Sequence, residues 1–541
     1  MKRLLIPLLA LLILVQAGAQ SQIQRPKMVI GLVVDQMRWD YLYRYFDRYG
    51  NDGFKRLIRD GFSCDNTQIP YSKTVTAAGH ASIYTGSVPA VHGIVANDWI
   101  ERETESFMYC TRDLSVNPVG TNSAWSRMSP ANLLTSTIGD ELRLATNFRG
   151  KVIGIAIKDR GSILPAGHLA NAAYWFDDQT GNWVTSSYYM KDLPGWVKGF
   201  NQLRKQDELL KQDWNLLYDY STYKNSTEDD KHYEKVVEAD SSRVFPHSYK
   251  RVIGSNNYYS FRVSPYGNTY TLDFALKLLV EEKMGQRNET DLLCISLSSP
   301  DYLGHRFGPN SLEMEDCYLR LDRDLAGFFH SLDSLYGKNN YLMFLTADHG
   351  SPQISAFLAE NHYPAGTLNA NKVAIDLNNA CAQQFGSSAL VKKIYDYDLY
   401  IDMKKVDSMK LDKGVVEKFI SEKLMEMNEV MTAFPVRELK SQVIPELLRE
   451  KIGNNYYARR SGDVVFTLKP QYTDFTPTGL EHGTWYQYDS HIPLIWYGWG
   501  IRTGKLNRET LITDIAPTLA ALLHIQSPNG SIGKVIGEAL K

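Results

Sequence analysis

The sequence lacks a dominant charge of either sign. Its 541 residues contain 59 lysines and arginines and 61 aspartates and glutamates, a formal net charge of −2. Proteins that bind nucleic acid or adhere to anionic membranes carry a clustered excess of basic residues. The composition therefore gives no electrostatic case for a nucleic-acid partner, while 43% hydrophobic residues leave ample material for a large core.

Cysteine is scarce, with five residues and no Cys-x-x-Cys pair. This excludes the ligand spacing of a zinc finger. An odd number leaves at least one cysteine unpaired in a monomer. A bridge between Cys64 and Cys110 is a candidate in an oxidising compartment, whereas Cys294 lies inside an apolar run and is typical of a small buried side chain.

The N-terminal apolar run is short. Lys2 and Arg3 precede the apolar residues 4–15, and Ala17-Gly18-Ala19 follows them. A basic end, a short apolar stretch and small residues are the three parts of a secretory signal peptide, and the run is short for a transmembrane helix. We therefore expect residues 1–19 to be removed on export, with no stable membrane insertion afterwards. An uncleaved membrane anchor is the alternative.

Four apolar runs have the same sequence pattern, in which β-branched and aliphatic residues are followed by charged residues. They are Met28–Val34 before Asp35, Val152–Ile157 before Lys158-Asp159-Arg160, Leu292–Leu297 before Asp301, and Tyr341–Ala347 before Asp348-His349-Gly350. Runs without polar alternation are typical of strands buried on both faces of a parallel sheet. Because ligands gather beyond the carboxyl ends of such strands, the charged residues are expected along one edge.

Amphipathic stretches separate these runs. The pattern predicts an α/β fold, a doubly wound and mostly parallel sheet with helices on both faces. Helices are expected at 271–283, 311–335 and 514–524, and a further strand at 491–496.

Two segments fit this core less well. Residues 166–265 are rich in tyrosine, tryptophan and charge, and residues 360–480 hold strand candidates at 400–403 and 464–468 and a charged helix at 415–427. We expect one catalytic domain over residues 20–541, with these two segments as insertions that form a cap over the sheet edge.

Six carboxylate and imidazole groups accompany these elements. They are Asp35, Asp301, His305, Asp348, His349 and His482. Carboxylate and imidazole together suit Zn²⁺, and one helical turn places residues i and i+4 on the same face. Six groups suffice for two zinc ions with three protein ligands each, which leaves each metal an open position. Taken singly, each is an ordinary cap or loop residue, and His491 is an alternative to His482.

The segment Lys73-Thr74-Val75-Thr76-Ala77-Ala78-Gly79-His80 offers hydroxyl groups at the start of an expected helix. A hydroxyl there lies over the positive end of the helix dipole, and coordination to zinc lowers its pKa, so it can act as a nucleophile. The alternative is a threonine that only caps the helix.

The order of these residues along the chain, Asp35, Thr76, Asp301 and His305, Asp348 and His349, and then His482, resembles that of the alkaline phosphatase superfamily over nearly the whole mature chain. Within it the sequence is most similar to the phosphate-irrepressible, periplasmic alkaline phosphatases of the PafA type, which share a core with type I phosphodiesterases and nucleotide pyrophosphatases. The stretches GLVVDQMRWDYLYRY, IYTGSVPAVHGIVANDW, IKDRGSILPAGH and DCYLRLDRDLA carry this match.

The resemblance implies two zinc ions. Asp301, His305 and His482 would bind one ion, and Asp35, Asp348 and His349 the other. Thr76, rather than Thr74, would be the nucleophile, complete the second zinc site and form a phosphothreonine intermediate. The resemblance also implies a periplasmic enzyme.

The resemblance further implies that Asn97, Lys158 and Arg160 bind the phosphate. Two cations two residues apart at a strand end can point to the same side. The two positive charges interact more strongly with the dianion of a phosphate monoester than with a diester, which has one fewer anionic oxygen. Small-molecule phosphate monoesters are therefore the expected substrates. The main alternative is a phosphodiesterase or nucleotide pyrophosphatase on the same two-zinc core. A sulfatase and a metal-free exported binding protein fit less well, and the oligomeric state stays open.

Overall fold

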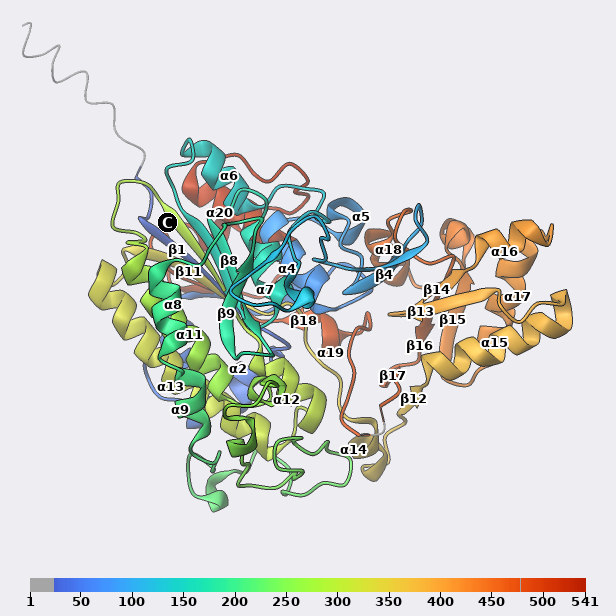
Figure 1. Cartoon of the computed structure of the whole chain (residues 1–541), viewed down its shortest axis with the longest axis horizontal. Helices are drawn as coiled ribbons and strands as arrows, with labels where there is room; N and C mark the ends of the chain where they lie inside the picture. The colour runs from blue at the N-terminus through green and yellow to red at the C-terminus, as the bar shows by residue number, and fades with distance from the viewer. Residues whose placement is uncertain (1–23, 477) are drawn as a thin grey trace, which may run out of the picture.

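The structure, a computed structural model, describes residues 24–476 and 478–541 (Figure 1). The expected signal segment, residues 1–19, lies outside the described residues. No helix within the described ranges combines the length and apolarity needed to span a bilayer.

A ten-stranded sheet forms the centre of the described chain, in the order β20-β2-β19-β11-β1-β10-β7-β8-β9-β6. Its outer strands include β20 (Gly504–Leu506) and β2 (Phe62–Cys64) at one end and β6 (Pro118–Val119) at the other. Its middle strands are parallel: β1 (Met28–Val34) pairs with β10 (Asp291–Leu297) and β11 (Tyr341–Thr346), and β10 pairs with β7 (Val152–Ala156). Every residue of these four strands is buried. The four apolar runs are therefore confirmed as the core strands of a mostly parallel sheet, and their carboxyl ends meet at one edge.

Helices cover both faces of this sheet (Figure 1). On one side α11 (Tyr266–Glu281) packs with α13 (Leu312–Tyr336), and on the other α4 (Thr76–Thr85) packs with α7 (Asp159–Ala166) and α20 (Ile515–Leu523). Ser311 accepts a hydrogen bond from the Met314 amide and so caps α13. The doubly wound α/β fold expected from the sequence is confirmed.

The expected strand at 491–496 is divided at Pro493. Residues His491–Ile492 (β18) pair with β3 (Thr67–Gln68), and Leu494–Gly498 (β19) joins the central sheet antiparallel to β11. Because proline has no backbone N–H, it cannot donate to a ladder, and the chain changes sheets there.

The segment 166–265 differs from the expected insertion. Its first part supplies β8 (Ala172–Asp177) and β9 (Asn182–Ser186), two strands of the central sheet. β8 is mostly apolar and fully buried, and four of the five residues of β9 are buried although three of the five are polar, so both strands belong to the core. Later residues such as Trp214 and Phe261 belong to the same main hydrophobic core.

The segment 360–480, called here the insertion lobe, has a core of its own. Its antiparallel sheet has the order β13 (Val391–Tyr395), β14 (Asp398–Ile401), β16 (Val464–Leu468) and β15 (Val430–Pro435). Helices α15 (Ala370–Phe385) and α17 (Lys413–Met425) pack on it and enclose a separate apolar cluster. In Figure 1 this orange lobe stands beside the main sheet.

The cysteines are free thiols. Cys64, Cys110, Cys294, Cys317 and Cys381 are all buried and unpaired, so the candidate bridge between Cys64 and Cys110 is not formed. Burial raises the pKa of the Cys64 thiol to about 12, which keeps it in the unreactive protonated form.

A buried histidine fastens residues 213–250 to α13. His247 is fully buried, with Nε2 3.0 Å from Glu313 Oε1 and Nδ1 3.7 Å from Asp240 Oδ2. Burial alone would lower the pKa of His247, but the neighbouring Asp240 and Glu313 carboxylates raise it from 6.5 to about 9.

This ion pair makes the stability of the protein depend on pH. A histidine whose pKa is raised in the folded state stabilises the fold fully at pH values below its pKa in the unfolded chain. That stabilisation is lost as the pH rises through its pKa in the folded state. The gap in free energy of unfolding between wild type and His247→Gln should therefore shrink by roughly 2–3 kcal/mol between about pH 6.5 and pH 9. Urea denaturation of both proteins across this range measures it, and a gap that stays constant with pH would contradict the assignment.

Candidate active site

Three buried carboxylates meet beyond the carboxyl ends of the central strands. Asp35 follows β1, Asp348 follows β11, and Asp301 lies in α12 (Ser299–Phe307), which begins after β10. Asp35 and Asp348 are fully buried and Asp301 is 2% exposed. Burial and the neighbouring Asp348 carboxylate raise the pKa of Asp35 well above its usual range, which reflects the cost of holding these negative charges together.

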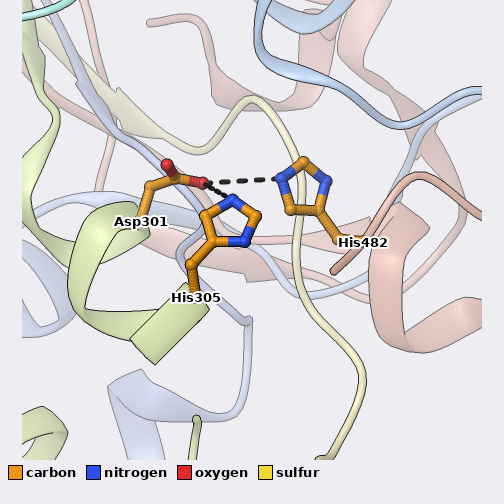
Figure 2. Close-up of side chains that lie close together, drawn as sticks. All are labelled: Asp301, His305 and His482. Atoms are coloured by element: carbon orange, nitrogen blue, oxygen red, sulfur yellow. Dashed lines mark ion pairs between the residues drawn. The ribbon is translucent and has the colours of Figure 1, made fainter. Parts of the chain in front are cut away.

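The first group of expected ligands comes together as shown in Figure 2. His305 Nε2 lies 3.4 Å, and His482 Nε2 3.5 Å, from Asp301 Oδ1. On the opposite side of each ring, Nδ1–H donates to a backbone carbonyl oxygen at 2.9 Å, from His305 to Leu480 and from His482 to Thr74. Because a carbonyl can only accept, each Nδ1 carries a proton, and Nε2 is the ring nitrogen that faces the carboxylate.

The second group shows the same arrangement. His349 Nδ1 donates to the Gly350 carbonyl at 2.9 Å, and its Nε2 lies 3.7 Å from Asp35 Oδ1 and 3.5 Å from Asp348 Oδ2. Burial lowers the pKa of His349 to about 3, so the ring is neutral, the form in which histidine binds metal.

The donor set fits divalent cations. His349 Nε2 and Asp35 Oδ1 are buried without a hydrogen-bond partner among the described residues, an arrangement that is costly unless a cation satisfies them. Ligand atoms of Asp301, His305 and His482, and separately of Asp35, Asp301 and His349, lie within 4.8 Å of one another. Asp348 adjoins the second set, and Asp301 stands between the two. Oxygen and imidazole donors of this kind suit zinc.

Thr76 and Thr74 have different surroundings. Helix α4 begins at Thr76 with Val75 in the N-cap position, so Thr76 is not the residue that caps the helix. Its Oγ1 accepts a hydrogen bond from Lys158 Nζ at 3.2 Å, and that ammonium also lies 2.8 Å from Asp35 Oδ2 and 2.5 Å from Asp301 Oδ2. Thr74 instead donates to the Thr484 carbonyl at 2.7 Å. The Thr76 hydroxyl therefore adjoins both groups of ligands.

Close packing sets the position of α4. A Cβ added to Gly79 would lie 2.3 Å from the Asp348 carbonyl oxygen, so only glycine lets the helix approach the loop after β11 this closely.

The expected phosphate-binding residues lie around the start of α4. Asn97 Oδ1 accepts a hydrogen bond from the Ala77 amide at 3.0 Å. Lys158 is the N-cap residue of α7 and Arg160 lies in its first turn, with Nη1 donating to the Tyr109 hydroxyl at 3.0 Å. The expectation that Lys158 and Arg160 share one side of a strand end is wrong, because β7 ends at Ala156 and the helix begins at Asp159.

Sequence reasoning missed Gln36. This residue is 2% exposed, and it donates from Nε2 to Asp301 Oδ1 at 2.9 Å and from its backbone to Asp348 Oδ1 at 3.1 Å. Its φ of 62° is unusual for a residue with a side chain, and such strain gathers at functional sites. Adjacency to Asp35 was its only signal in the sequence.

The other histidines near these segments serve the framework. His491 Nε2 bonds to the Asp65 carbonyl at 2.9 Å and its ring stacks on Trp39, so His491 is not part of either ligand group. His80 bonds to the Thr76 carbonyl and to Ser296 Oγ, which supports α4 from behind.

Comparison with known proteins identifies the family. Residues 29–485 match the family described as type I phosphodiesterase / nucleotide pyrophosphatase. The chain belongs to this family.

Similar proteins narrow the assignment. The chain is 48% identical over 520 residues to alkaline phosphatase PhoV of Synechococcus elongatus, with 96% of this chain and 94% of that protein covered. It is 43% identical over 527 residues to alkaline phosphatase PafA of Elizabethkingia meningoseptica, with 97% and 96% covered. A Myroides odoratus protein named calcium-transporting ATPase is 47% identical with the same coverage.

Crystal structures of similar proteins support the same assignment. The crystal structure of wild-type PafA superposes on this chain with a TM-score of 0.94 at 43% identity, and the match covers 96% of this chain and 100% of the PafA chain. A PafA variant substituted at one threonine, one asparagine, one lysine and one arginine matches with the same TM-score at 42% identity. Within the family, the chain is a PafA-type alkaline phosphatase, and the resemblance noted in the sequence is confirmed.

In this phosphatase the insertion lobe holds the loop that precedes Thr76. Lys73 Nζ forms an ion pair of 2.5 Å with Asp398 Oδ2 of β14, and both side chains are buried. Asn455, 3% exposed, accepts from the Lys73 amide at 3.3 Å and donates to the Val95 carbonyl at 3.2 Å. The lobe thus ties the Thr76 loop to the loop that carries Asn97.

Removal of one partner of the buried ion pair should destabilise the protein. Asp398→Ala leaves the Lys73 ammonium buried without a counter-charge and should lower the free energy of unfolding by roughly 3–5 kcal/mol. Lys73→Met/Asp398→Leu leaves no such charge and should lose less. Glu422→Ala removes the exposed partner of Lys418 on α17 and should cost less than about 0.5 kcal/mol. Urea denaturation measures all three, and equal losses for Asp398→Ala and Glu422→Ala would refute the role of the pair.

Proposed function

We propose that the enzyme acts through the hydroxyl of Thr76 beside two zinc ions, and that Asn97, Lys158 and Arg160 bind the phosphate. The enzyme is an alkaline phosphatase, a phosphate monoester hydrolase, as its full-length similarity to PhoV and PafA indicates. The observation that carries the two-zinc proposal is the common geometry of three histidines. In His305, His349 and His482 a backbone carbonyl holds Nδ1 and leaves Nε2 beside buried carboxylates.

We assign the residues to the two sets expected from the sequence. Asp301, His305 and His482 would hold one zinc ion, and Asp35, Asp348 and His349, joined by Thr76 Oγ1, the other. Zinc supplies Lewis-acid chemistry, since it lowers the pKa of a bound hydroxyl or water and offsets negative charge on phosphate oxygens.

The chain's own groups account for the remaining chemistry. Thr76 Oγ1, at the positive end of α4, attacks phosphorus, so that the Oγ1–P bond forms while the ester P–O bond breaks and the leaving oxygen departs as an alcohol. Water then attacks the phosphorus of the phosphothreonine and the Oγ1–P bond breaks, which releases phosphate and regenerates the threonine hydroxyl. Lys158 Nζ, 3.2 Å from Thr76 Oγ1, is close enough to bind a non-bridging oxygen of the same phosphate.

The relatives support the assignment of the phosphate-binding residues. The substituted PafA variant changes a threonine, an asparagine, a lysine and an arginine. The same four residue types stand here in the same order as Thr76, Asn97, Lys158 and Arg160.

Two further segments belong to this proposal. Residues 1–19 carry the basic, apolar and small-residue parts of a signal peptide, so we propose that the enzyme is exported to the periplasm. The insertion lobe, tied to the Thr76 loop through Lys73, is proposed to act as a cap over the sheet edge.

The test compares p-nitrophenyl phosphate with bis-p-nitrophenyl phosphate. Wild type should prefer the monoester, and Lys158→Ala/Arg160→Ala should lower that preference on the order of a thousandfold, because the two cations serve the extra anionic oxygen. Thr76→Ala should abolish turnover of both esters. Lys211→Ala/Lys418→Ala, which removes two exposed cations, is the matched control and should change neither rate. A better rate with the diester, unaffected by the double substitution, would instead support the phosphodiesterase alternative.

A further inference from the structure

A cavity of about 360 Å³ opens beside the proposed phosphate site. Its walls come from β4 (Asp98–Glu101) and β5 (Ser106–Tyr109), from a short helix at Ala124–Ser126, and from the end of β8 and the chain that follows it. Arg160 lies in its wall, and so does Asp98, the residue after Asn97. Arg160, one of the groups proposed to bind the phosphate, therefore lies between the phosphate site and this cavity. Its volume suits one small organic group.

Aromatic side chains form much of the wall. Trp125 is 70% exposed and Phe107 43% exposed, although such large apolar rings usually lie inside a fold, and the buried Trp175 also lines the cavity. Both exposed rings have supporting contacts. Phe107 packs on Tyr395 of the insertion lobe with ring centroids 6.1 Å apart, and the Arg112 guanidinium lies 5.8 Å from the centroid of Trp125. The cavity thus offers flat apolar surfaces on which a second ring could stack.

The charged side chains in the cavity wall differ in whether they have hydrogen-bond partners. Arg262 donates to Asp178 at 2.5 Å, and Asp159 accepts from the Tyr109 and Thr111 hydroxyls. Asp98 accepts no hydrogen bond from any described residue, although it lies half-buried in the wall. Once Arg160 is engaged with phosphate, Asp98 leaves this end of the cavity negative, which disfavours a second anionic group there and favours a hydrogen-bond donor.

From these walls we infer that the cavity is a leaving-group subsite for aromatic phosphate monoesters whose leaving group carries no further negative charge. Phe107 and Trp125 stack on the ring, and Asp98 rejects anionic leaving groups. This inference rests on the proposed phosphatase site, because it assigns the cavity to the organic part of the same substrate.

The first test separates stacking from chemistry. Trp125→Ala should lower kcat/KM for 1-naphthyl phosphate roughly tenfold, mainly through KM, and leave ethyl phosphate within about twofold. Phe148→Ala removes a half-exposed ring that is not part of the cavity wall and is the matched control. An equal effect of Trp125→Ala on both substrates, or no effect on either, would overturn the subsite.

The second test addresses charge. Inorganic pyrophosphate has an anionic leaving group and no ring, so Asp98→Asn should raise its kcat/KM roughly tenfold relative to ethyl phosphate. An unchanged ratio would overturn the role of Asp98.

A binding measurement separates failure of the subsite from failure of the proposed function. By calorimetry, 1-naphthylphosphonate should bind wild type more tightly than ethylphosphonate does, and Trp125→Ala should remove that advantage without any turnover. If Trp125→Ala removes the binding advantage but the wild-type enzyme hydrolyses no monoester, only the catalytic proposal is refuted. If the advantage persists in Trp125→Ala, the subsite is refuted.

Discussion

The hydrogen bond from a histidine Nδ1–H to a backbone carbonyl is the interaction on which the site depends. It occurs three times, from His305 to Leu480, from His349 to Gly350 and from His482 to Thr74. Each bond selects the tautomer and aims Nε2 toward a carboxylate that is already buried. Without these bonds the rings could rotate, and the carboxylates Asp35, Asp301 and Asp348 would lack an organised partner.

The fold supplies both halves of this arrangement. Parallel strands bring Asp35, Asp301 and Asp348 to one edge, because β1, β10 and β11 are neighbours that run in the same direction. The carbonyl acceptors come from loops, and the Thr74 carbonyl belongs to the loop that Lys73 ties to the insertion lobe. The lobe therefore contributes to the alignment of His482 and Thr76 even though it carries neither residue, and its Tyr395 also supports the wall of the adjoining cavity.

The strands and the site residues could be predicted from the sequence for different reasons. Met28–Val34 and its three companion runs are continuous apolar stretches, and burial on both faces follows directly from that composition. Five of the six proposed ligands stood out because they follow those runs, whereas His482 stands alone in the sequence, and the resemblance to a known family then divided the six into two sets. The structure brings these residues together, and their roles remain the proposal made above.

Features that depend on tertiary context could not be predicted in the same way. The strands β8 and β9 lie in a segment that was judged by its tyrosine and tryptophan content, although β8 is mostly apolar and nearly every residue of both strands is buried. The position of Lys158 and Arg160 at a helix start depends on where β7 ends, a boundary that periodicity locates poorly. The contacts of Gln36, and of Asn455 with two distant loops, join residues far apart in the chain and leave no local pattern.

Anomalous diffraction at the zinc edge, from crystals of the enzyme purified without added metal, tests the central claim most directly. The account predicts two zinc peaks per chain, on the order of 4 Å apart. One should be bound by Asp301, His305 and His482, and the other by Asp35, Asp348 and His349. A fully active enzyme with a single peak, or with none at these residues, would contradict it.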